Sequence, residues 1–408
     1  MRRTITVLLI LALCLSLMAC GTSSADTPAH TQEPQHKIGV IVYNTGDQEV
    51  IGFREYLKGY IESNFEMVQF IYSGSITSGA EELDFIQKAC DDGVEGFMSF
   101  LSHDLAAEVA LCEKNKAYYL LASGTVSDTD YESVADKPWF LGVFGPGRAY
   151  EFQAGADMAS YFARQKFGDR YFILSGGAPL GNEMHYQRTF GILNALAMAY
   201  GVSFNRSREE LAATDQPITL EAGELTVTIC PGYVARENYL ETAKAAYAAG
   251  SYDAVLSVLP PEGMVDVIGK TPLGVIDAYH TRNLQLVNDG ILRFVVGKYS
   301  SMIGPAFALM LNAVTGNAAD FRGSDGRAIR VTQGFWESDS MEDYVEKYTL
   351  SSSASKNAYN FDDLSQVIRI YNQNANLPEL VALAEACSFY AVEARRNAAG
   401  SAGQVSEG

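Results

Sequence analysis

Polar side chains that could hold a small solute follow several apolar runs of this 408-residue chain. The runs at 37–44, 94–101 and 117–122 each have the composition of a buried strand. In an open α/β sheet, ligands are held at the carboxyl ends of the strands. The candidate ligand-binding residues at these ends are Asn44, Asp47, Ser102, His103, Asp104, Ser123 and Thr125.

Each of these residues also has an ordinary structural role open to it. Asn44 and Asp47 are turn formers, and one of Ser102, His103 and Asp104 must cap the following helix, so at most two of those three contact a solute. The same three residue types occur together in nucleophilic active sites. Here they are consecutive, however, and consecutive side chains at the start of a helix point in different directions. The sequence contains no GxSxG, HExxH or P-loop motif, and its five histidines form no metal-spaced pair. We therefore predict no enzymatic activity, no metal site and no cofactor.

The elements that position these residues alternate between strand and helix in two successive series. The first series spans 37–122, and the second begins with a strand at 170–175 and continues to the strand at 273–277. In both series an amphipathic helix stops at a glycine, Gly93 or Gly250, before the next apolar strand. This alternation predicts the α/β class, with two Rossmann-like lobes that each contain a parallel sheet.

The N-terminus has the pattern of a secretory signal. Arg2 and Arg3 precede an apolar run at 5–18, shorter than the roughly 20 residues of a spanning helix. The run ends in Leu-Met-Ala-Cys at 17–20, which resembles the lipobox of bacterial lipoproteins and implies lipidation of Cys20. The alternative is an ordinary signal with an incidental cysteine. We expect a lipoprotein signal peptide at 1–20 and a flexible tether at 21–36. The lipid would anchor the protein at the extracytoplasmic face of the cell membrane. We expect no second apolar run that is long enough to span the membrane.

Charge and cysteine usage exclude further classes of function. The net charge of −19 argues against a nucleic-acid partner, because phosphates require Lys and Arg patches. No CxxC motif is present, so a zinc or redox motif has no support. Cys90 and Cys112 continue the apolar stripes of two predicted helices, which favours buried thiols; a disulfide between them is the alternative.

Four stretches in their order resemble the type I periplasmic solute-binding proteins of the ribose- and galactose-binding kind. They are KIGVIVYN at 37–44 with its helix, CDDGVEGFMSFLSHD at 90–104, an Arg-x-x-Gly pattern within 187–191, and a strand ending in an acidic residue at 273–277. These proteins are receptors of ABC sugar importers. The resemblance implies two lobes joined by a three-crossing hinge that closes on its ligand.

The resemblance also implies domain boundaries. The crossings would fall near Phe167, Lys298 and Gln333. Lobe one would then comprise 37–167 plus 299–333, and lobe two 168–298 plus 334–376. A C-terminal helix at 377–396 and a disordered tail at 397–408 would follow.

Three further candidate ligand-binding residues come from the resemblance. Asp277 corresponds to an acidic residue that accepts hydroxyl hydrogen bonds, and Arg188 to a ligand-binding arginine whose guanidinium donates a planar fork. Structural roles remain open to both, a helix cap for Asp277 and an ion pair for Arg188. The chain departs from the family at 260–263, where Pro-Pro-Glu-Gly replaces an Asn-Asp pair, and at Lys298, where the family has Gln. Two cations, Arg188 and Lys298, at one cleft would suit an anionic ligand.

The function implied is a monomeric, lipid-anchored receptor that captures a small polar solute, a sugar or sugar derivative, and delivers it to an ABC permease. The same scaffold could instead bind a nucleoside or an autoinducer, or serve a sensor kinase. An extracytoplasmic enzyme is the least favoured alternative.

Overall fold

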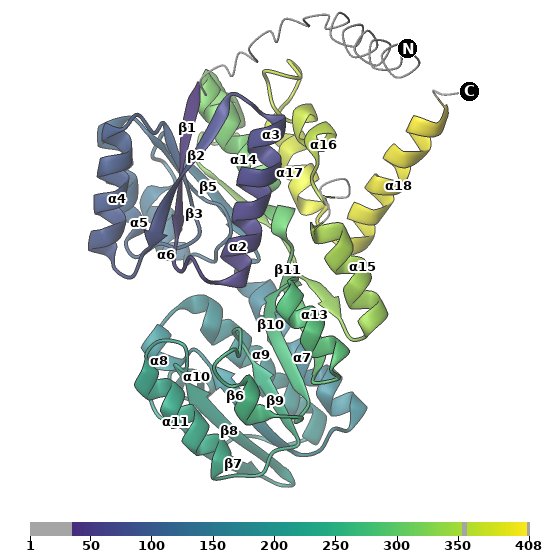
Figure 1. The fold of residues 1–408 in the computed structure, drawn as a ribbon. Helices are drawn as coiled ribbons and strands as arrows, with labels where there is room; N and C mark the ends of the chain where they lie inside the picture. The colour runs from purple at the N-terminus through teal and green to yellow at the C-terminus, as the bar shows by residue number, and fades with distance from the viewer. Residues whose placement is uncertain (1–34, 353–356, 406–408) are drawn as a thin grey trace, which may run out of the picture. The chain divides into compact units, whose positions relative to one another are not determined.

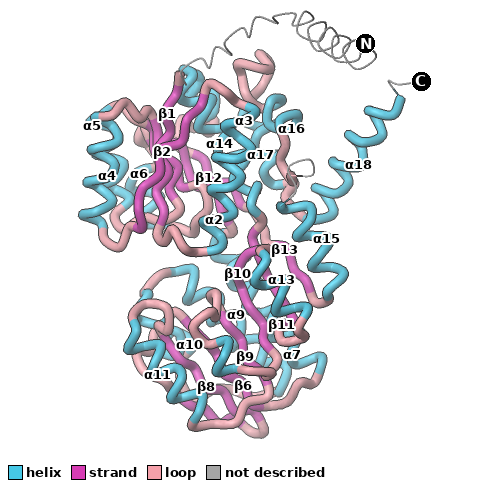
Figure 2. Tube along the Cα trace, in the orientation of Figure 1, coloured by secondary structure: helices cyan, strands magenta, loops and turns pink. Residues whose placement is uncertain are grey.

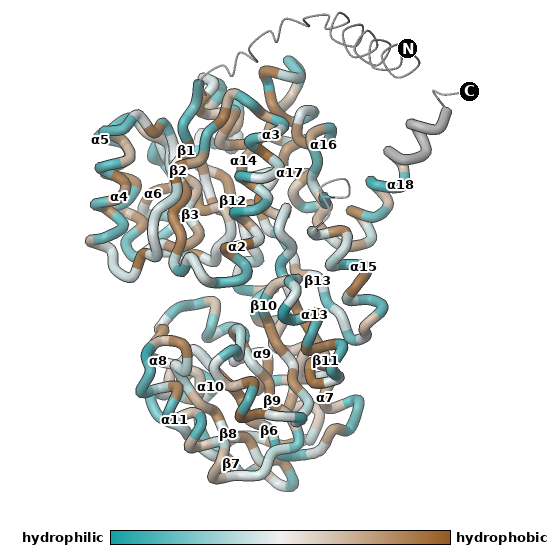
Figure 3. The backbone as a smooth tube through the Cα atoms, in the orientation of Figure 1, coloured by the Kyte–Doolittle hydropathy of each residue, from teal (hydrophilic) through white to brown (hydrophobic). Residues whose placement is uncertain are grey.

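The computed structural model describes residues 35–352 and 357–405 (Figure 1). The predicted signal peptide, Cys20 and most of the predicted tether lie outside the described residues. Strands of two separate sheets are enclosed by helices (Figure 2), and the hydrophobic stretches in Figure 3 follow the strands of both sheets. The predicted α/β class is confirmed, with two sheets of mostly parallel strands.

The first lobe is built on a six-stranded, wholly parallel sheet in the order β12-β5-β4-β3-β1-β2. Its strands are β1 (His36–Val42), β2 (Val68–Ser75), β3 (Gly96–Ser99), β4 (Tyr118–Leu121), β5 (Phe140–Gly145) and β12 (Ile329–Thr332). Its helices include α2 (Gln48–Arg54), continued by a π-helical stretch (Glu55–Ile61), α4 (Gly79–Asp91), α5 (Leu105–Asn115), α6 (Asp128–Val134) and α14 (Gly304–Asn312). The last five residues of β1 are buried, as expected for a strand covered on both faces.

The second lobe is built on a seven-stranded sheet in the order β13-β11-β10-β9-β6-β8-β7. Its parallel centre comprises β6 (Arg170–Ser175), β8 (Leu225–Pro231), β9 (Ala254–Ser257), β10 (Leu273–Ala278) and β11 (Leu292–Lys298). The edges β7 (Ile218–Ala222) and β13 (Trp336–Ser338) are antiparallel. Its helices include α7 (Gly147–Gln165), α9 (Glu183–Tyr200), α11 (Glu237–Ala248) and α13 (Thr281–Asn288).

The first crossing between the lobes lies at Pro146, directly after β5, and the prediction of a crossing near Phe167 is wrong. Helix α7 packs along α9 and against β10 and β11 of the second lobe. Two glycines allow this close packing. A Cβ on Gly155 would lie 2.0 Å from the carbonyl oxygen of Arg188, and one on Gly191 would lie 2.0 Å from that of Phe152. An amphipathic pattern identifies the buried face of a helix but not the sheet that it covers.

The other crossings follow from strand pairing. Strand β11 belongs to the second sheet, and the chain enters the first lobe again at Ser300. Strand β12 pairs with β5, whereas β13 pairs with β11, so the last crossing lies at 333–335. Strands β12 and β13, only three residues apart in the chain, therefore belong to different sheets.

The C-terminal region is divided between the lobes. Helix α15 (Met341–Ser352) contacts α13 and β13, but α16 (Phe361–Gln366) and α17 (Leu377–Glu385) contact α14 of the first lobe. The Tyr56 hydroxyl donates to the Tyr359 carbonyl at 2.8 Å, and the Phe361 N–H donates to the Tyr60 hydroxyl at 2.9 Å. Assignment of 357–376 to lobe two is thus wrong.

The chain end is more helical than expected. A break at 386–388 divides the predicted helix 377–396 into α17 and α18 (Phe389–Val405). Helix α18 continues through most of the predicted tail, of which 406–408 lie outside the described residues.

The helical stretch Ser300–Phe321, which contains α14, is long and apolar enough to cross a membrane by length and composition, with a mean hydropathy of 1.2. The expectation that no second run reaches this length is wrong. In its most apolar 18-residue window, 67% is buried inside the protein, since α14 is covered by β3, β4 and β5 and by α16 and α17. This burial identifies it as a core helix.

Candidate solute-binding site

Residues of the loop after β1 and the start of α2 form the first-lobe part of the site. Asp47 caps α2: its Oδ1 accepts from the N–H groups of Glu49 at 2.8 Å and Val50 at 3.4 Å. Asn44 is exposed, and its Oδ1 accepts from the Gly46 N–H at 2.9 Å, which is the turn-forming role. Helix α2 contacts β10 of the second lobe, so Asp47 lies at an interlobe position.

Lys298, the last residue of β11, reaches across to the first lobe. Its Nζ lies 3.0 Å from Glu49 Oε1, and the two side chains are only 5% and 14% exposed. Burial of this kind strengthens the attraction between the charges and makes loss of either partner costly. The pair links the second crossing of the hinge to the first turn of α2.

Asp277 lies near the end of β10 and is buried. Its Oδ2 accepts from His280 Nε2 at 2.8 Å and from Asn283 Nδ2 at 2.7 Å. The other nitrogen of His280, Nδ1, caps α13 by accepting from the Asn283 N–H at 3.4 Å. Asp277 is therefore held in place by two side chains of the segment that follows its own strand.

The two lobes bring carboxyl groups within electrostatic range of each other. Burial, followed by the charges of Glu49 and Asp277, raises the pKa of Asp47 to about 7. Burial and Asp277 likewise raise the pKa of Glu262, which belongs to the segment that departs from the family pattern. Strand pairing supports the same placement, because Asp277 and Ala278 lie beside Gly297 and Lys298 on β11.

Arg188 is the centre of a second buried cluster. Its Nε donates to Glu151 Oε2 at 2.6 Å, and its Nη1 donates to the Val258 carbonyl at 2.8 Å. The hydroxyl of Thr125, in the loop after β4, donates to the other oxygen of Glu151 at 3.2 Å. The guanidinium also lies 5.7 Å from the centroid of the Phe335 ring, at the third crossing. The cluster connects the first lobe to α7 and α9 of the second.

Both cations that suggested an anionic solute are already paired with carboxylates. Glu49 neutralises Lys298, and Glu151 neutralises Arg188. Sequence reasoning could not find these partners, because each pair joins residues far apart in the chain. The argument for an anionic solute therefore loses its basis.

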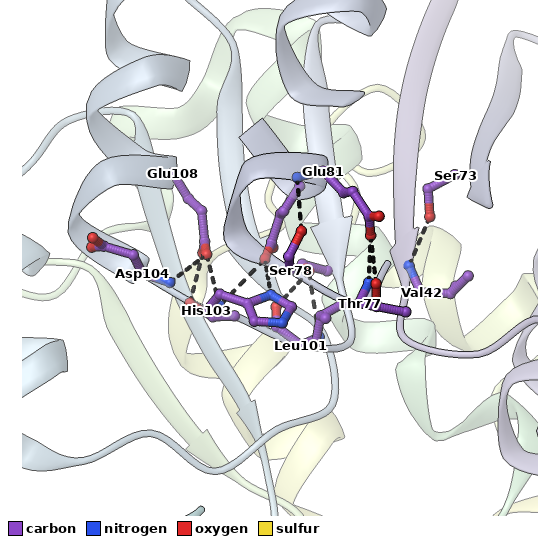
Figure 4. A network of polar contacts seen from close by, with 12 residues as sticks. Val42, Ser73, Thr77, Ser78, Glu81, Leu101, His103, Asp104 and Glu108 are labelled. Atoms are coloured by element: carbon purple, nitrogen blue, oxygen red, sulfur yellow. Dashed lines mark hydrogen bonds and ion pairs between the residues drawn. The ribbon is translucent and has the colours of Figure 1, made fainter. Parts of the chain in front are cut away.

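The sequence Ser102-His103-Asp104 takes part in a network inside the first lobe. Ser102 Oγ donates to Glu108 Oε2 at 2.6 Å, His103 Nδ1 lies 2.8 Å from Glu82 Oε2, and Asp104 caps α5. Figure 4 shows His103 and Asp104 around the carboxylate of Glu108, which accepts from both of their N–H groups. We predicted solute contacts for these residues, but the structure uses the Ser102 and Asp104 side chains within the lobe.

The two glutamates of this network are buried, and the Tyr119 hydroxyl lies 2.8 Å from Glu108 and 3.3 Å from Glu82. Burial, followed by the charge of Glu108, raises the pKa of Glu82 to about 8. Burial of the two acids together thus favours the protonated form of Glu82.

Two buried polar atoms near these clusters have no hydrogen-bond partner among the described residues. Ser123 Oγ lies just after β4, and His185 Nδ1 lies on α9, one turn before Arg188. Burial, followed by the charge of Arg188, lowers the pKa of His185 to about 3, so its imidazole is neutral. Ser123 was a sequence candidate. His185 was missed, as were Glu49 and Glu151, since no local signal marks them.

Within 35–352 and 357–405, no group of three or more His, Cys, Asp or Glu residues could hold a metal ion. The four cysteines of these ranges are free thiols, so the alternative disulfide between Cys90 and Cys112 is not formed.

No family model matches the chain, and no curated protein matches it. Many solved structures do. A galactofuranose-binding protein aligns with a TM-score of 0.58 at 10% identity over 78% of this chain and 100% of its own. A solute-binding protein of an ABC transporter from Bacillus halodurans, with bound myo-inositol, aligns with a TM-score of 0.55 at 14% identity, over 78% of this chain and 98% of its own.

A periplasmic solute-binding protein of an ABC transporter from Actinobacillus succinogenes, with bound D-allose, aligns with a TM-score of 0.57 at 12% identity, over 76% of this chain and 99% of its own. The three alignments cover 98–100% of the length of each neighbour. The chain therefore has the type I periplasmic binding protein fold, the fold of the sugar-binding components of ABC transporters.

Proposed function

We propose that this chain is an extracytoplasmic receptor that captures a small polyhydroxylated solute between its two lobes and delivers it to an ABC permease. The observation that carries the proposal is the position of Asp277. It is a buried carboxylate near the end of a central strand, and its Oδ2 is oriented by two donors while α2 of the other lobe contacts the same strand. Carboxylates of this kind are strong acceptors for sugar hydroxyls.

The crossings supply the mechanism of capture. A solute that contacts Asp277 from the second lobe and the Asp47 region from the first gains its full binding energy only when both lobes contact it, so binding favours the closed form. Aromatic packing stiffens the segments that connect the lobes, because the rings of Tyr299 and Trp336 stack with their centroids 3.9 Å apart.

The cellular address and partners also belong to the proposal. The Leu-Met-Ala-Cys sequence supports lipidation at Cys20, which would tether a monomeric receptor to the outer face of the membrane beside its permease. A Cys20→Ala variant should leave the membrane fraction. Retention of that variant in membranes that are washed with high salt would contradict the anchor.

The proposal excludes catalysis. Arg188, Lys298 and Asp277 are engaged by neighbouring side chains, and a binding protein that releases its solute unchanged needs no nucleophile. Of the neighbours in fold that are named above, one is a galactofuranose-binding protein and two are solute-binding proteins of ABC transporters, which supports this assignment.

Thermal unfolding of the full chain in a panel of pentoses, hexoses, cyclitols, nucleosides and amino acids tests the proposal. A ligand that binds only the folded state raises Tm in proportion to its saturation. We expect a rise with a carbohydrate or cyclitol that Asp277→Ala abolishes and that the exposed control Asp215→Asn retains. A rise only with nucleosides or amino acids would overturn the assignment of the solute class.

A further inference from the structure

The site between β10 and α2 has an imbalance of charge that bears on the chemistry of its solute. Its cation, Lys298, is neutralised by Glu49, as Arg188 of the second cluster is by Glu151. Asp47 and Asp277 remain, and in the described part of the chain neither forms an ion pair with a lysine or arginine.

The contacts of these two carboxylates come from groups other than lysine and arginine. Asp47 accepts backbone N–H groups at the start of α2. Asp277 accepts from the Asn283 amide and lies 2.8 Å from His280 Nε2, while His280 Nδ1 caps α13.

The two carboxylates come from opposite lobes and lie close enough to interact. Helix α2 contacts β10, and the ion pair of Glu49 with Lys298 fixes the first turn of α2 beside the strand next to Asp277. Their mutual repulsion contributes to the raised pKa of Asp47, after burial and the charge of Glu49. Glu262 adds a third carboxyl within range of Asp277, with Arg282 and His280 also within range of Glu262.

A second feature points to a ligand independently of these charges. Ser123, at the carboxyl end of β4 in the sheet that also carries the Asp47 loop, is 3% exposed, and its Oγ has no partner among the described residues. A buried hydroxyl without a partner carries a desolvation cost that a solute hydroxyl would offset.

We propose that the solute is an aminated polyol, such as an amino sugar or an aminocyclitol, whose ammonium group binds between Asp47 and Asp277. The inference rests on the proposed function and narrows its solute class. An ammonium donates to both carboxylates and removes their repulsion, whereas a carboxylate or phosphate adds to it. Because the two acids come from different lobes, the same ammonium group favours closure.

Calorimetric titration with matched triplets tests the proposal on the full chain near neutral pH. Each triplet has one configuration in three forms: glucosamine, glucose and glucuronate; galactosamine, galactose and galacturonate; mannosamine, mannose and mannuronate. For the configuration that binds, we expect the amine to bind about tenfold or more tightly than the neutral sugar, and the uronate most weakly. Added salt should reduce this preference.

In the variants Asp47→Asn and Asp277→Asn, the ratio of the affinity for the amine to that for the neutral sugar should fall towards one. Asparagine still caps a helix and still accepts from His280 and Asn283, so both variants should fold, which thermal unfolding of the free proteins checks. Asp215→Asn, an exposed carboxylate of the second lobe, is the matched control and should keep the preference.

Three results would overturn the inference, and they separate it from the proposed function. Tightest binding of a neutral sugar or uronate, or an amine preference that both aspartate variants retain, would overturn the inference and leave the receptor function standing. Binding of no member of any triplet would overturn the inference, and it would overturn the receptor function as well only if no pentose or cyclitol raises Tm.

Discussion

The guanidinium of Arg188 and the carboxylate of Glu151 form an ion pair of 2.6 Å, with the two side chains 6% and 1% exposed. Glu151 also accepts from Thr125 of the first lobe, so one carboxylate joins α7, α9 and the end of β4. A residue expected to bind the solute directly is thereby held by the protein itself.

Substitution of Glu151 by Gln should destabilise the protein strongly, because it leaves a buried guanidinium without its counter-ion. We expect the free energy of unfolding to fall by about 3–5 kcal/mol in urea titration. Thr125→Val removes only one hydrogen bond to Glu151 and should cost about 1–3 kcal/mol. A Glu151→Gln variant as stable as the native chain would contradict the buried pair.

The contact of Lys298 with Glu49 should show measurable coupling. A double-mutant cycle compares the loss of unfolding free energy in Lys298→Met and in Glu49→Gln with the loss in the double variant. We expect an interaction energy of about 1–3 kcal/mol from denaturant unfolding. The pair Lys88 and Asp84, exposed on α4 at 2.7 Å, is the matched control and should couple by less than about 0.5 kcal/mol. Equal coupling in both cycles would show that the interlobe pair is not formed.

Glu82 should make stability fall with rising pH. Its pKa is about 8 in the folded protein against 4.5 for an ordinary glutamate, so folding takes up a proton between these values. The stabilisation is complete below about pH 4.5 and is lost as pH rises towards about 8. Glu82→Gln, neutral throughout, should flatten this slope and exceed the native stability by about 1–3 kcal/mol near pH 9.

Chemical denaturation across that pH range checks the prediction. Asp84→Asn, an exposed carboxylate on the same helix, should leave the slope above about pH 5 unchanged. An identical pH profile for Glu82→Gln and the native protein would mean that Glu82 is ionised in the fold.

The crossing of α7 and α9 should not accept a side chain at Gly191. An added Cβ would lie 2.0 Å from the Phe152 carbonyl oxygen and 2.7 Å from the Ala156 nitrogen, so the helices must separate. We expect Gly191→Ala to cost about 1–3 kcal/mol of stability, measured by urea unfolding. Gly59→Ala, where a Cβ meets nothing within 4 Å, should be neutral or slightly stabilising.

Local patterns in the sequence predicted the strands well and the partners of the site poorly. The position of Asp277 on β10 followed from an apolar run, because burial of a strand on both faces leaves a direct record in its composition. Arg188 was found by motif, but its engagement by Glu151 depends on which sheet α7 covers, and helical periodicity does not encode that choice. The same limit placed the first crossing at Phe167 instead of Pro146.

Native mass spectrometry of the full chain purified from its own cells tests the central claim most directly. A receptor that closes on its solute retains it, so we predict a one-to-one adduct that is released unchanged on unfolding and has the mass of a monosaccharide, amino sugar or cyclitol. An adduct with the mass of a nucleoside or peptide, or a retained compound that the protein converts into a product, would contradict the account.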